Sequence, residues 1–479
     1  MSDMTKLSLP GRMLFLSSDP DIVEAQLRRH NVDLSGDVPL RHEISTDEIT
    51  PLPTMVHFDE EIGRFSHTGF RAGDRFPIGK DALKEGGFSV LVAGRRYGKG
   101  SSREHSPFAE LSAGIRLVIA ESFERIYRQN CDNLGLFTST DLGLVERIQA
   151  GESISVEELV ADREPLAGRI LSEGGLLRFG ERHLKDLTPE ELADDGQPRT
   201  LVEKIIRRHL LAVSGIDWEG VPGTGGFVRA RYRFIHEMYT AMGRYFLHRH
   251  YGTPLKLHEP DSILCFEDHN SYAHRSPTHI RGNLLPGIRR QSEGHRLFAR
   301  ENNLVDHGYL DGEEGSEGIA HAMMAERYAV PGEILVGTDS HTPHSGALGC
   351  LAFGVGTTDI INSFMTGAVR MTAPQSLLVR LEGALPVGAT AKDAVLHLLA
   401  MPSMREGGGL AKAIEFAGPV IDAMSIDERA TLTNMTAEMG GFTGIVAPDE
   451  ETVRFLKERR GIDFEIEPWM RSDPAAGFA

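Results

Sequence analysis

The sequence predicts an α/β protein with two regions, in each of which apolar runs alternate with amphipathic ones. The run Ser89–Ala93 is followed by the loop GRRYGKGSSREHSP (94–107), a helix expected near 102–113, and the run IRLVIAES (115–122). This order is typical of a parallel α/β unit, in which ligands bind at the carboxyl ends of strands. From residue 262 onward, short apolar runs again end in polar turns, in ILCFEDHNS (263–271) and EILVGTDSHT (333–342).

A linker is expected between the two regions. Residues 186–200, DLTPEELADDGQPRT, are acidic, contain two prolines and lack apolar periodicity. After them, LVEKIIRRHLLAV (201–213) has helical periodicity, and the glycine-rich SGALGCLAFGVGTTDIINSFMTG (345–367) is expected to form a helix packed closely on a neighbour. The first region therefore spans 1–185 and the second spans 201–479.

Composition excludes several classes of function. The formal net charge of -18 argues against general binding to nucleic acid or to anionic membranes. The N-terminal apolar run at Met13–Leu16 is too short for a signal peptide, and no segment approaches membrane-spanning length, so we expect a cytoplasmic protein. The three cysteines, at 131, 265 and 350, form no CxxC pair and no disulfide framework.

The loop at 94–107 does not match a phosphate-binding Walker loop, because only three residues separate Gly94 from Gly98 and Lys99 is followed by glycine. The spacing of Ser101 and Glu104 is that of a helix capping box, which is a common structural feature. The alternative is an anion site, in which the basic side chains of the loop and a helix N-terminus bind a carboxylate or a phosphate. A serine in that positive field could also act as a base.

Two turns combine aspartate with histidine at predicted strand ends. Asp339 and His341 follow one strand, and Asp268 and His269 follow another. A carboxylate beside an imidazole raises its basicity, which suits proton transfer or metal binding, although either turn alone could be purely structural.

Two further groups are ambiguous by themselves. His321 lies on an apolar helix face, where a histidine is usually a core residue, and Glu438 lies in the apolar, glycine-rich NMTAEMGGFTG (434–444). A carboxylate in such a segment needs a partner or a shifted pKa.

Taken in chain order, these motifs resemble those of the aconitase and isopropylmalate dehydratase family of hydro-lyases. The resemblance covers most of 40–185 and 260–479, and GSSREH together with GTDSHT is highly specific. The segments that carry it are STDEITP (45–51), YGKGSSREHSP (97–107), SFERIYRQNCDNLGL (122–136), FEDH (266–269), GIAH (318–321), VGTDSHTPHSGALG (336–349) and NMTAEMGGFTG.

The resemblance implies an aconitase-like α/β fold. Residues 1–185 would form the swivelling small domain, and 201–479 would form a larger three-layer α/β region equivalent to the first two domains of the large subunit. The cysteine-bearing third domain is expected to be absent from this chain, because none of the three cysteines falls at a cluster position.

The resemblance also implies roles for site residues. Ser101 matches the catalytic base, and the pair Asp268 and His269 matches the acid that protonates the departing hydroxyl. The supporting proton network corresponds to His321, Asp339, His341 and Glu438, and the substrate contacts correspond to Ser102, Arg103, Asp47 and Ser340.

The implied activity is dehydration of a hydroxy di- or tricarboxylic acid, with or without readdition of water that would isomerise it. The family's iron–sulfur cluster is expected on a cysteine-bearing partner chain, with no metal ligand in this one, and no nucleic-acid or membrane partner is expected. The alternatives are a cluster-independent lyase or isomerase of the same fold, and a non-catalytic RNA-binding regulator, against which the charge of -18 weighs.

Overall fold

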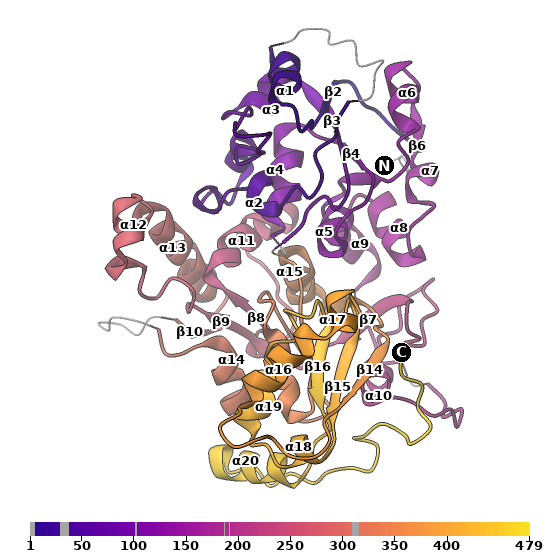
Figure 1. Cartoon of the computed structure of the whole chain (residues 1–479), viewed down its shortest axis with the longest axis vertical. Helices are drawn as coiled ribbons and strands as arrows, with labels where there is room; N and C mark the ends of the chain where they lie inside the picture. Colours follow the sequence, from indigo (N-terminus) through magenta and orange to yellow (C-terminus); the bar gives the residue numbers. More distant parts are fainter. Residues whose placement is uncertain (1–4, 29–37, 101–102, 186, 191, 309–315) are drawn as a thin grey trace.

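The computed structural model describes residues 5–28, 38–100, 103–185, 187–190, 192–308 and 316–479. The chain forms two lobes that lie one above the other in Figure 1. The strands of the N-terminal lobe lie between Lys6 and Ser155, and those of the C-terminal lobe lie between Gly225 and Val446. Both lobes contain parallel sheets with helices around them, which confirms the predicted α/β class.

The N-terminal lobe has a parallel sheet whose order follows the chain. Its strands are β2 (Arg12–Phe15), β3 (Phe88–Ala93), β4 (Leu117–Ala120) and β5 (Phe137–Ser139). A short antiparallel pair joins β1 (Lys6–Leu7) to β6 (Ile154–Ser155). The helices are α1 (Pro20–Leu27), α2 (Thr46–Ile49), α3 (Ala82–Gly86), α4 (His105–Ala113), α5 (Arg125–Leu134), α6 (Leu144–Gln149), α7 (Val156–Val160), α8 (Pro165–Ser172) and α9 (Leu176–His183).

The C-terminal lobe is built on a five-stranded parallel sheet with the order β10-β9-β8-β11-β12. These strands are β8 (Tyr232–His236), β9 (Ile263–Phe266), β10 (Val305–His307), β11 (Ile334–Gly337) and β12 (Leu351–Gly354). The chain adds β9 and β10 on one side of β8, and then β11 and β12 on the other. The order therefore reverses between β8 and β11, the point at which open α/β sheets bind ligands beyond their carboxyl ends.

Two smaller sheets complete this lobe. One is parallel, with β14 (Ser376–Arg380), β15 (Ala413–Ala417) and β16 (Thr443–Val446), and the other pairs β7 (Gly225–Arg229) with β13 (Ala368–Thr372) in antiparallel fashion. The helices are α10 (Leu201–Arg208), α11 (Glu237–Tyr251), α12 (Pro277–Arg281), α13 (Leu285–Glu301), α14 (Ala320–Met323), α15 (Thr357–Thr366), α16 (Ala391–Ala400), α17 (Pro402–Arg405), α18 (Pro419–Asp422), α19 (Ile426–Asn434) and α20 (Glu450–Arg460).

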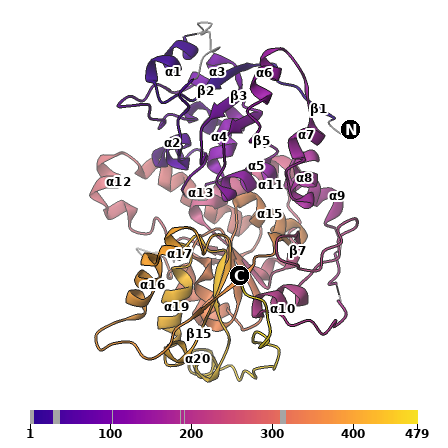
Figure 2. The same ribbon diagram turned by 45° about the vertical axis from the view of Figure 1, so that its right-hand side comes forward.

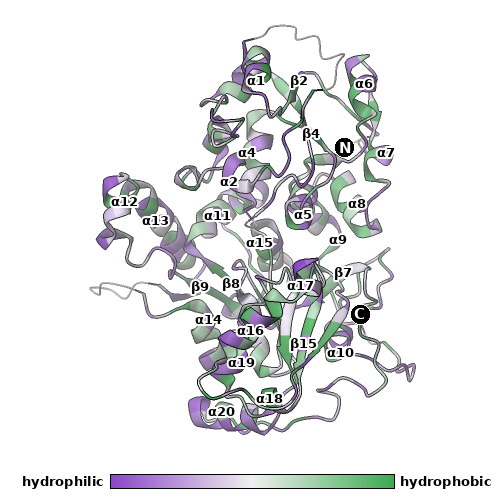
Figure 3. Ribbon diagram, in the orientation of Figure 1, coloured by the Kyte–Doolittle hydropathy of each residue, from purple (hydrophilic) through white to green (hydrophobic). Residues whose placement is uncertain are grey.

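The strands are continuous apolar runs because helices cover both faces of a parallel sheet. All six residues of β3, FSVLVA, are buried, and so are all four residues of β4, β9 and β11. In Figure 3 the central strand β15 is mainly green, while α20 at the edge of the molecule is largely purple. Hydrophobic burial thus places the sheets inside and the charged helix faces outside.

Two predicted helices differ from the structure. Of the helix expected near 102–113, the described part begins at His105, and the side chain of Glu104 bonds to Thr358 of α15. The segment 345–367 is not one helix, because Leu351–Gly354 pairs with β11 as strand β12 before α15 begins. Glycines at both ends of that strand break the helical pattern, which sequence periodicity alone did not resolve.

The two lobes share a packed interface. Phe108 of α4 packs edge-on against Phe246 of α11, with ring centroids 4.7 Å apart, inside a core cluster to which both lobes contribute. Figures 1 and 2 both place α15 below α5, where the lobes meet. Gly180 of α9 also approaches α15 closely, since a Cβ atom there would lie 2.1 Å from the side-chain oxygen of Asn362.

None of the helices within the described residues combines the length and the apolar character needed to cross a lipid bilayer.

Candidate active site

Polar side chains gather at the carboxyl ends of three adjacent strands. His236 is the last residue of β8, Asp268 and His269 follow β9, and Asp339 follows β11. Because β9, β8 and β11 are parallel neighbours, these side chains meet at one edge of the sheet, beside the point where the strand order reverses. The structure therefore brings the two predicted Asp/His turns together.

Asp339 is the centre of a hydrogen-bonded cluster. Its Oδ2 lies 3.1 Å from Nε2 of His269, and its Oδ1 lies 2.9 Å from Nε2 of His321. Asp268 joins the cluster from the other side, with Oδ1 2.8 Å from Nδ1 of His269 and Oδ2 accepting the backbone N–H of Ala320 at 2.7 Å. These contacts hold the pKa of both aspartates below the usual range, in spite of their burial.

His269 is held as an imidazolium. Its two ring nitrogens face the carboxylates of Asp268 and Asp339, and an ionised carboxylate can only accept, so both nitrogens must carry a proton. Burial opposes the charge, but the two carboxylates outweigh it and raise the pKa of His269 to about 10. The ring of His269 therefore carries a proton at neutral pH.

A second branch of the cluster leads toward solvent. The backbone N–H of His341 donates to Asp339 Oδ1 at 2.7 Å, and Nε2 of His341 lies 3.2 Å from Glu438 Oε1. Ser340 Oγ is 3.2 Å from Nδ1 of the same ring. The bonds to Asp339 and Glu438 raise the pKa of His341 to about 9. The Glu438 side chain is 43% exposed whereas that of Asp268 is 6% exposed, so the branch connects the interior to solvent.

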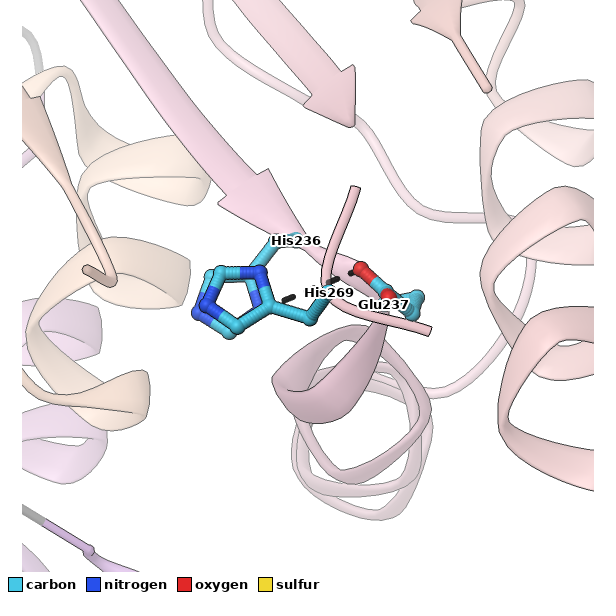
Figure 4. A group of neighbouring side chains, drawn as sticks. All are labelled: His236, Glu237 and His269. Atoms are coloured by element: carbon cyan, nitrogen blue, oxygen red, sulfur yellow. Dashed lines mark ion pairs between the residues drawn. The ribbon is translucent and has the colours of Figure 1, made fainter. Parts of the chain in front are cut away.

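The ring of His236 stacks on the ring of His269. His236 was not among the site residues identified from the sequence. The two imidazole rings stack with centroids 3.9 Å apart and planes 9° apart, as Figure 4 shows. Burial lowers the pKa of His236 to about 3, so a neutral ring lies against a charged one. Glu237 lies beside them and accepts the backbone N–H of Asn270 at 2.6 Å. His236 is the last residue of β8, close to the strand-end position of the two Asp/His turns, and that position is the signal that could have identified it.

His236, Glu237 and His269 are also close enough to suggest a metal site, with ligand atoms within 4.8 Å of one another. The stacking argues against it. A metal bound by imidazole lies near the ring plane at about 2.1 Å, and two parallel planes this far apart do not share such a point. Both nitrogens of His269 already face carboxylates as well.

The N-terminal lobe brings Arg103 to this region. Its guanidinium forms an ion pair with Asp47, and the Arg103 side chain is only 14% exposed. His105, two residues after Arg103, is buried. Its ring centroid lies 5.6 Å from the ring centroid of Tyr239 in the C-terminal lobe. Burial raises the pKa of Tyr239 to about 12, while the positive charge of Arg103 opposes this shift and the negative charge of Asp339 adds to it. Tyr239 is therefore near both halves of the predicted site.

The predicted residues Ser101 and Ser102 lie outside the described residues, so their roles as base and substrate contact stay predictions.

The cysteines do not fit an iron–sulfur cluster, whose iron atoms are held by thiolates. Cys131, Cys265 and Cys350 are each fully buried, in three different core clusters, and burial raises the pKa of every one of these thiols. Among the described residues, none of these cysteines bonds to the Asp/His cluster. An iron–sulfur cluster therefore cannot be assigned to these three residues.

The charge on His269 predicts a pH-dependent contribution to stability. Its pKa in the folded protein, about 10, lies above the ordinary value of 6.5, so its contribution is complete below pH 6.5 and is lost as the pH rises through about 10. We expect the unfolding free energy of the wild type to fall more steeply over this interval than that of His269→Asn. Urea titrations at a series of pH values measure this, and equal slopes would contradict the assignment.

Comparison with known proteins gives two family matches. Residues 246–475 match the aconitase family (aconitate hydratase), and residues 74–140 match the aconitase C-terminal domain. The segment similar to that C-terminal domain thus precedes the other match in this chain. Together the two matches cover more than half of the 479 residues.

Individual relatives are similar over shorter stretches. The chain is 37% identical over 190 residues to the 3-isopropylmalate dehydratase large subunit of Heliobacterium modesticaldum, covering 40% of this chain and 43% of that protein. It is 42% identical over 166 residues to a probable methanogen homoaconitase large subunit of Methanosarcina mazei, covering 34% and 41%. A crystal structure of 3-isopropylmalate dehydratase from Methanocaldococcus jannaschii matches with 27% identity and a TM-score of 0.23, over 29% of this chain and 88% of that one. The chain spans less than half the length of these large subunits.

Proposed function

This chain belongs to the aconitase and 3-isopropylmalate dehydratase family, and from that premise we propose that it is part of a hydro-lyase acting on a hydroxy di- or tricarboxylic acid. The observation that carries the proposal is the hydrogen-bonded chain that runs from Asp268 through His269 and Asp339 to His341 and Glu438. It combines a stored proton with a connection to solvent, which dehydration requires.

Dehydration breaks a C–H bond and a C–O bond on neighbouring carbons and forms a double bond between them. The C–H proton must go to a base, for which we propose Ser101, and the hydroxyl must gain a proton to leave as water. The imidazolium of His269 is the proposed donor of that second proton. One of its two N–H groups must leave its carboxylate partner to reach the hydroxyl, and the other carboxylate still holds the remaining N–H after the transfer.

The proton must then be restored for the next turnover. Asp339 contacts His321 and His341 as well as His269, and His341 reaches the exposed Glu438. We propose that protons return to His269 along this branch, with His321 holding Asp339 in place. The side-chain geometry supports this role because Nδ1 of His341 lies 3.5 Å from Asp339 Oδ1, so a small shift of the ring completes the path.

The substrate's carboxylates need positive partners and donors. Arg103 supplies a guanidinium, whose planar fork matches a carboxylate in a bidentate fashion, and Asp47 orients it. Ser102 and Ser340 are the further proposed substrate contacts. The names of the relatives, 3-isopropylmalate dehydratase and homoaconitase, are consistent with substrates that carry more than one carboxylate.

The family implies an iron–sulfur cofactor, and the buried cysteines of this chain do not suit its ligation. We propose that the thiolate ligands come from a second, cysteine-bearing polypeptide that binds this chain, with residues 1–185 as the small domain, 186–200 as the linker and 201–479 as the first two large-subunit domains. Three unpaired cysteines support a reducing compartment, and we propose the cytoplasm.

Anaerobic purification from the native source tests this proposal. We expect the chain to co-purify with an iron-containing, cysteine-bearing partner, and the complex to form an ultraviolet-absorbing unsaturated acid from 3-isopropylmalate or a related hydroxy acid. The isolated iron-free chain should be at least about a hundredfold less active, because a Lewis-acid metal contributes several kcal/mol to such a transition state. Full activity of the iron-free chain would overturn the partner proposal and establish a cluster-independent lyase.

A further inference from the structure

The loop that carries Arg103 is anchored at two buried ends. Tyr97 lies near its start and Glu104 at its end, and both side chains are fully buried. The intervening Lys99 is half exposed and forms an ion pair with Glu43 at 2.9 Å. The position of Arg103 therefore depends on what the two anchors bind.

The first anchor lies within the N-terminal lobe. The hydroxyl of Tyr97 donates to Glu110 Oε1 at 2.5 Å and lies 2.7 Å from Nε2 of His67. Gly98 has a φ of 81°, and a Cβ atom there would lie 2.2 Å from the ring of Tyr127. This anchor ties the loop to α4 and α5 of its own lobe.

The second anchor crosses to the C-terminal lobe. The carboxyl of Glu104 accepts the backbone N–H of Thr358 at 2.8 Å and also bonds to the Thr358 hydroxyl, in the first turn of α15. The residue that precedes this helix, Gly356, provides no side-chain cap of its own. A Cβ atom at Gly356 would lie 2.8 Å from Glu104 Oε2 and 2.6 Å from Asn130 Oδ1, so the glycine makes room for the other lobe. Glu104 thus caps a helix that lies 254 residues away in the chain.

The same helical turn receives a second set of bonds from the N-terminal lobe. Asp359 Oδ2 accepts from Nδ2 of Asn133 at 2.8 Å and from Nε2 of Gln129 at 3.2 Å, both on α5. Arg370 of β13 donates to Asn133 Oδ1 at 2.5 Å. Because these groups are buried, any separation of the lobes leaves polar atoms without partners, which is costly.

We propose that Glu104 is a positioning residue, whose docking on the first turn of α15 sets the place of Arg103 relative to Asp268, His269 and Asp339. Arg103 directly precedes Glu104, so a change in the docking of one displaces the other. This inference deepens the proposed function and rests on it only for the effect on turnover, since the docking itself can be measured without substrate.

Burial raises the pKa of Glu104 to about 8 in spite of the bonds from Thr358. The carboxyl is therefore largely neutral at neutral pH, and an amide of the same shape can replace it. In Glu104→Gln the side-chain oxygen still accepts the Thr358 N–H and the NH₂ group can donate to the hydroxyl. Glu104→Ala removes both bonds, so the two variants separate docking from charge.

Hydrogen exchange on the full chain provides the test without substrate. In Glu104→Ala we expect exchange in the first turn of α15 and in residues 97–100 and 103 to be faster by about tenfold or more, since a buried N–H has lost its acceptor. In Glu104→Gln exchange should remain close to that of the wild type. Ile119→Ala is the matched control, because Ile119 is a buried residue of β4 in a core cluster confined to the N-terminal lobe. It should lower stability without selective exchange at α15.

Steady-state kinetics of the native complex with 3-isopropylmalate complete the test. We expect Glu104→Ala to raise KM more than it lowers kcat, and Glu104→Gln to restore both. Unchanged exchange in Glu104→Ala, equal acceleration in Ile119→Ala, or an unchanged KM in an active complex would each overturn the inference. Selective exchange in a complex that turns over no hydroxy acid would support the docking and refute the proposed function.

Discussion

Asp339→Asn is expected to lower kcat by about a hundredfold to ten-thousandfold, the range typical of general acid–base catalysis. Asp339 accepts hydrogen bonds from His269, His321 and the backbone of His341. An asparagine has one acceptor oxygen and an NH₂ group that repels the N–H of His269, so it cannot keep all three. The pKa of His269 would fall because one of its two carboxylate partners is lost.

The measurement is the pH dependence of kcat for the native complex, together with its melting temperature. Glu333→Gln is the matched control, because Glu333 precedes the same strand, β11, at its opposite end, where it pairs with His209 and Arg231. Glu333→Gln also removes a carboxylate that pairs with a histidine, His209. It should nevertheless leave kcat within about twofold, because changes away from the site usually have small effects. An Asp339→Asn enzyme with normal kcat would exclude the cluster from the reaction.

Arg103→Lys is expected to lower kcat/KM by about tenfold to a hundredfold, mainly through KM, the loss expected for one hydrogen bond to a charged group. The Arg103 guanidinium has enough donors to hold Asp47 and a substrate carboxylate together. An ammonium keeps the charge but loses the planar fork, so it cannot reproduce the bidentate pairing.

The appropriate control for this change lies in the same loop. Arg95 pairs loosely with Glu121, at 3.8 Å, and its side chain is 66% exposed, so Arg95→Lys should leave kcat/KM within about twofold. Substrates with one carboxylate fewer sharpen the comparison. If Arg103 binds the missing group, the difference between wild type and Arg103→Lys disappears for the shorter substrate, whereas an equal loss with every substrate would contradict that role.

Local patterns predicted much of the candidate site. Asp268, His269 and Asp339 were identified because each follows an apolar run, and the carboxyl ends of adjacent parallel strands lie at one edge of a sheet. The strands themselves follow from uninterrupted apolar residues, as in β3 and β4. These features depend on residues that are close together in the chain, so they can be identified from one sequence without a structure.

The partner of Glu104 could not be predicted from local patterns. Ser101 and Glu104 have the spacing of a capping box, which left a cap and an anion site as alternatives. The structure pairs the Glu104 carboxyl with Thr358, because Gly356 leaves the N-terminus of α15 open and the lobe interface buries both groups. Local spacing does not indicate which of two helices a side chain caps.

The sequence by itself determined the α/β class and the strand-end position of the acid–base groups. Only the tertiary structure decided that Asp339 bonds to His269 and His321, that His236 stacks beneath His269, and that Glu104 joins the lobes. The reason is that strand and helix patterns arise from contacts between residues close in the chain. The contacts that only the tertiary structure decided join residues from 18 to 254 positions apart, and such residues meet only when buried surfaces of separate elements pack together.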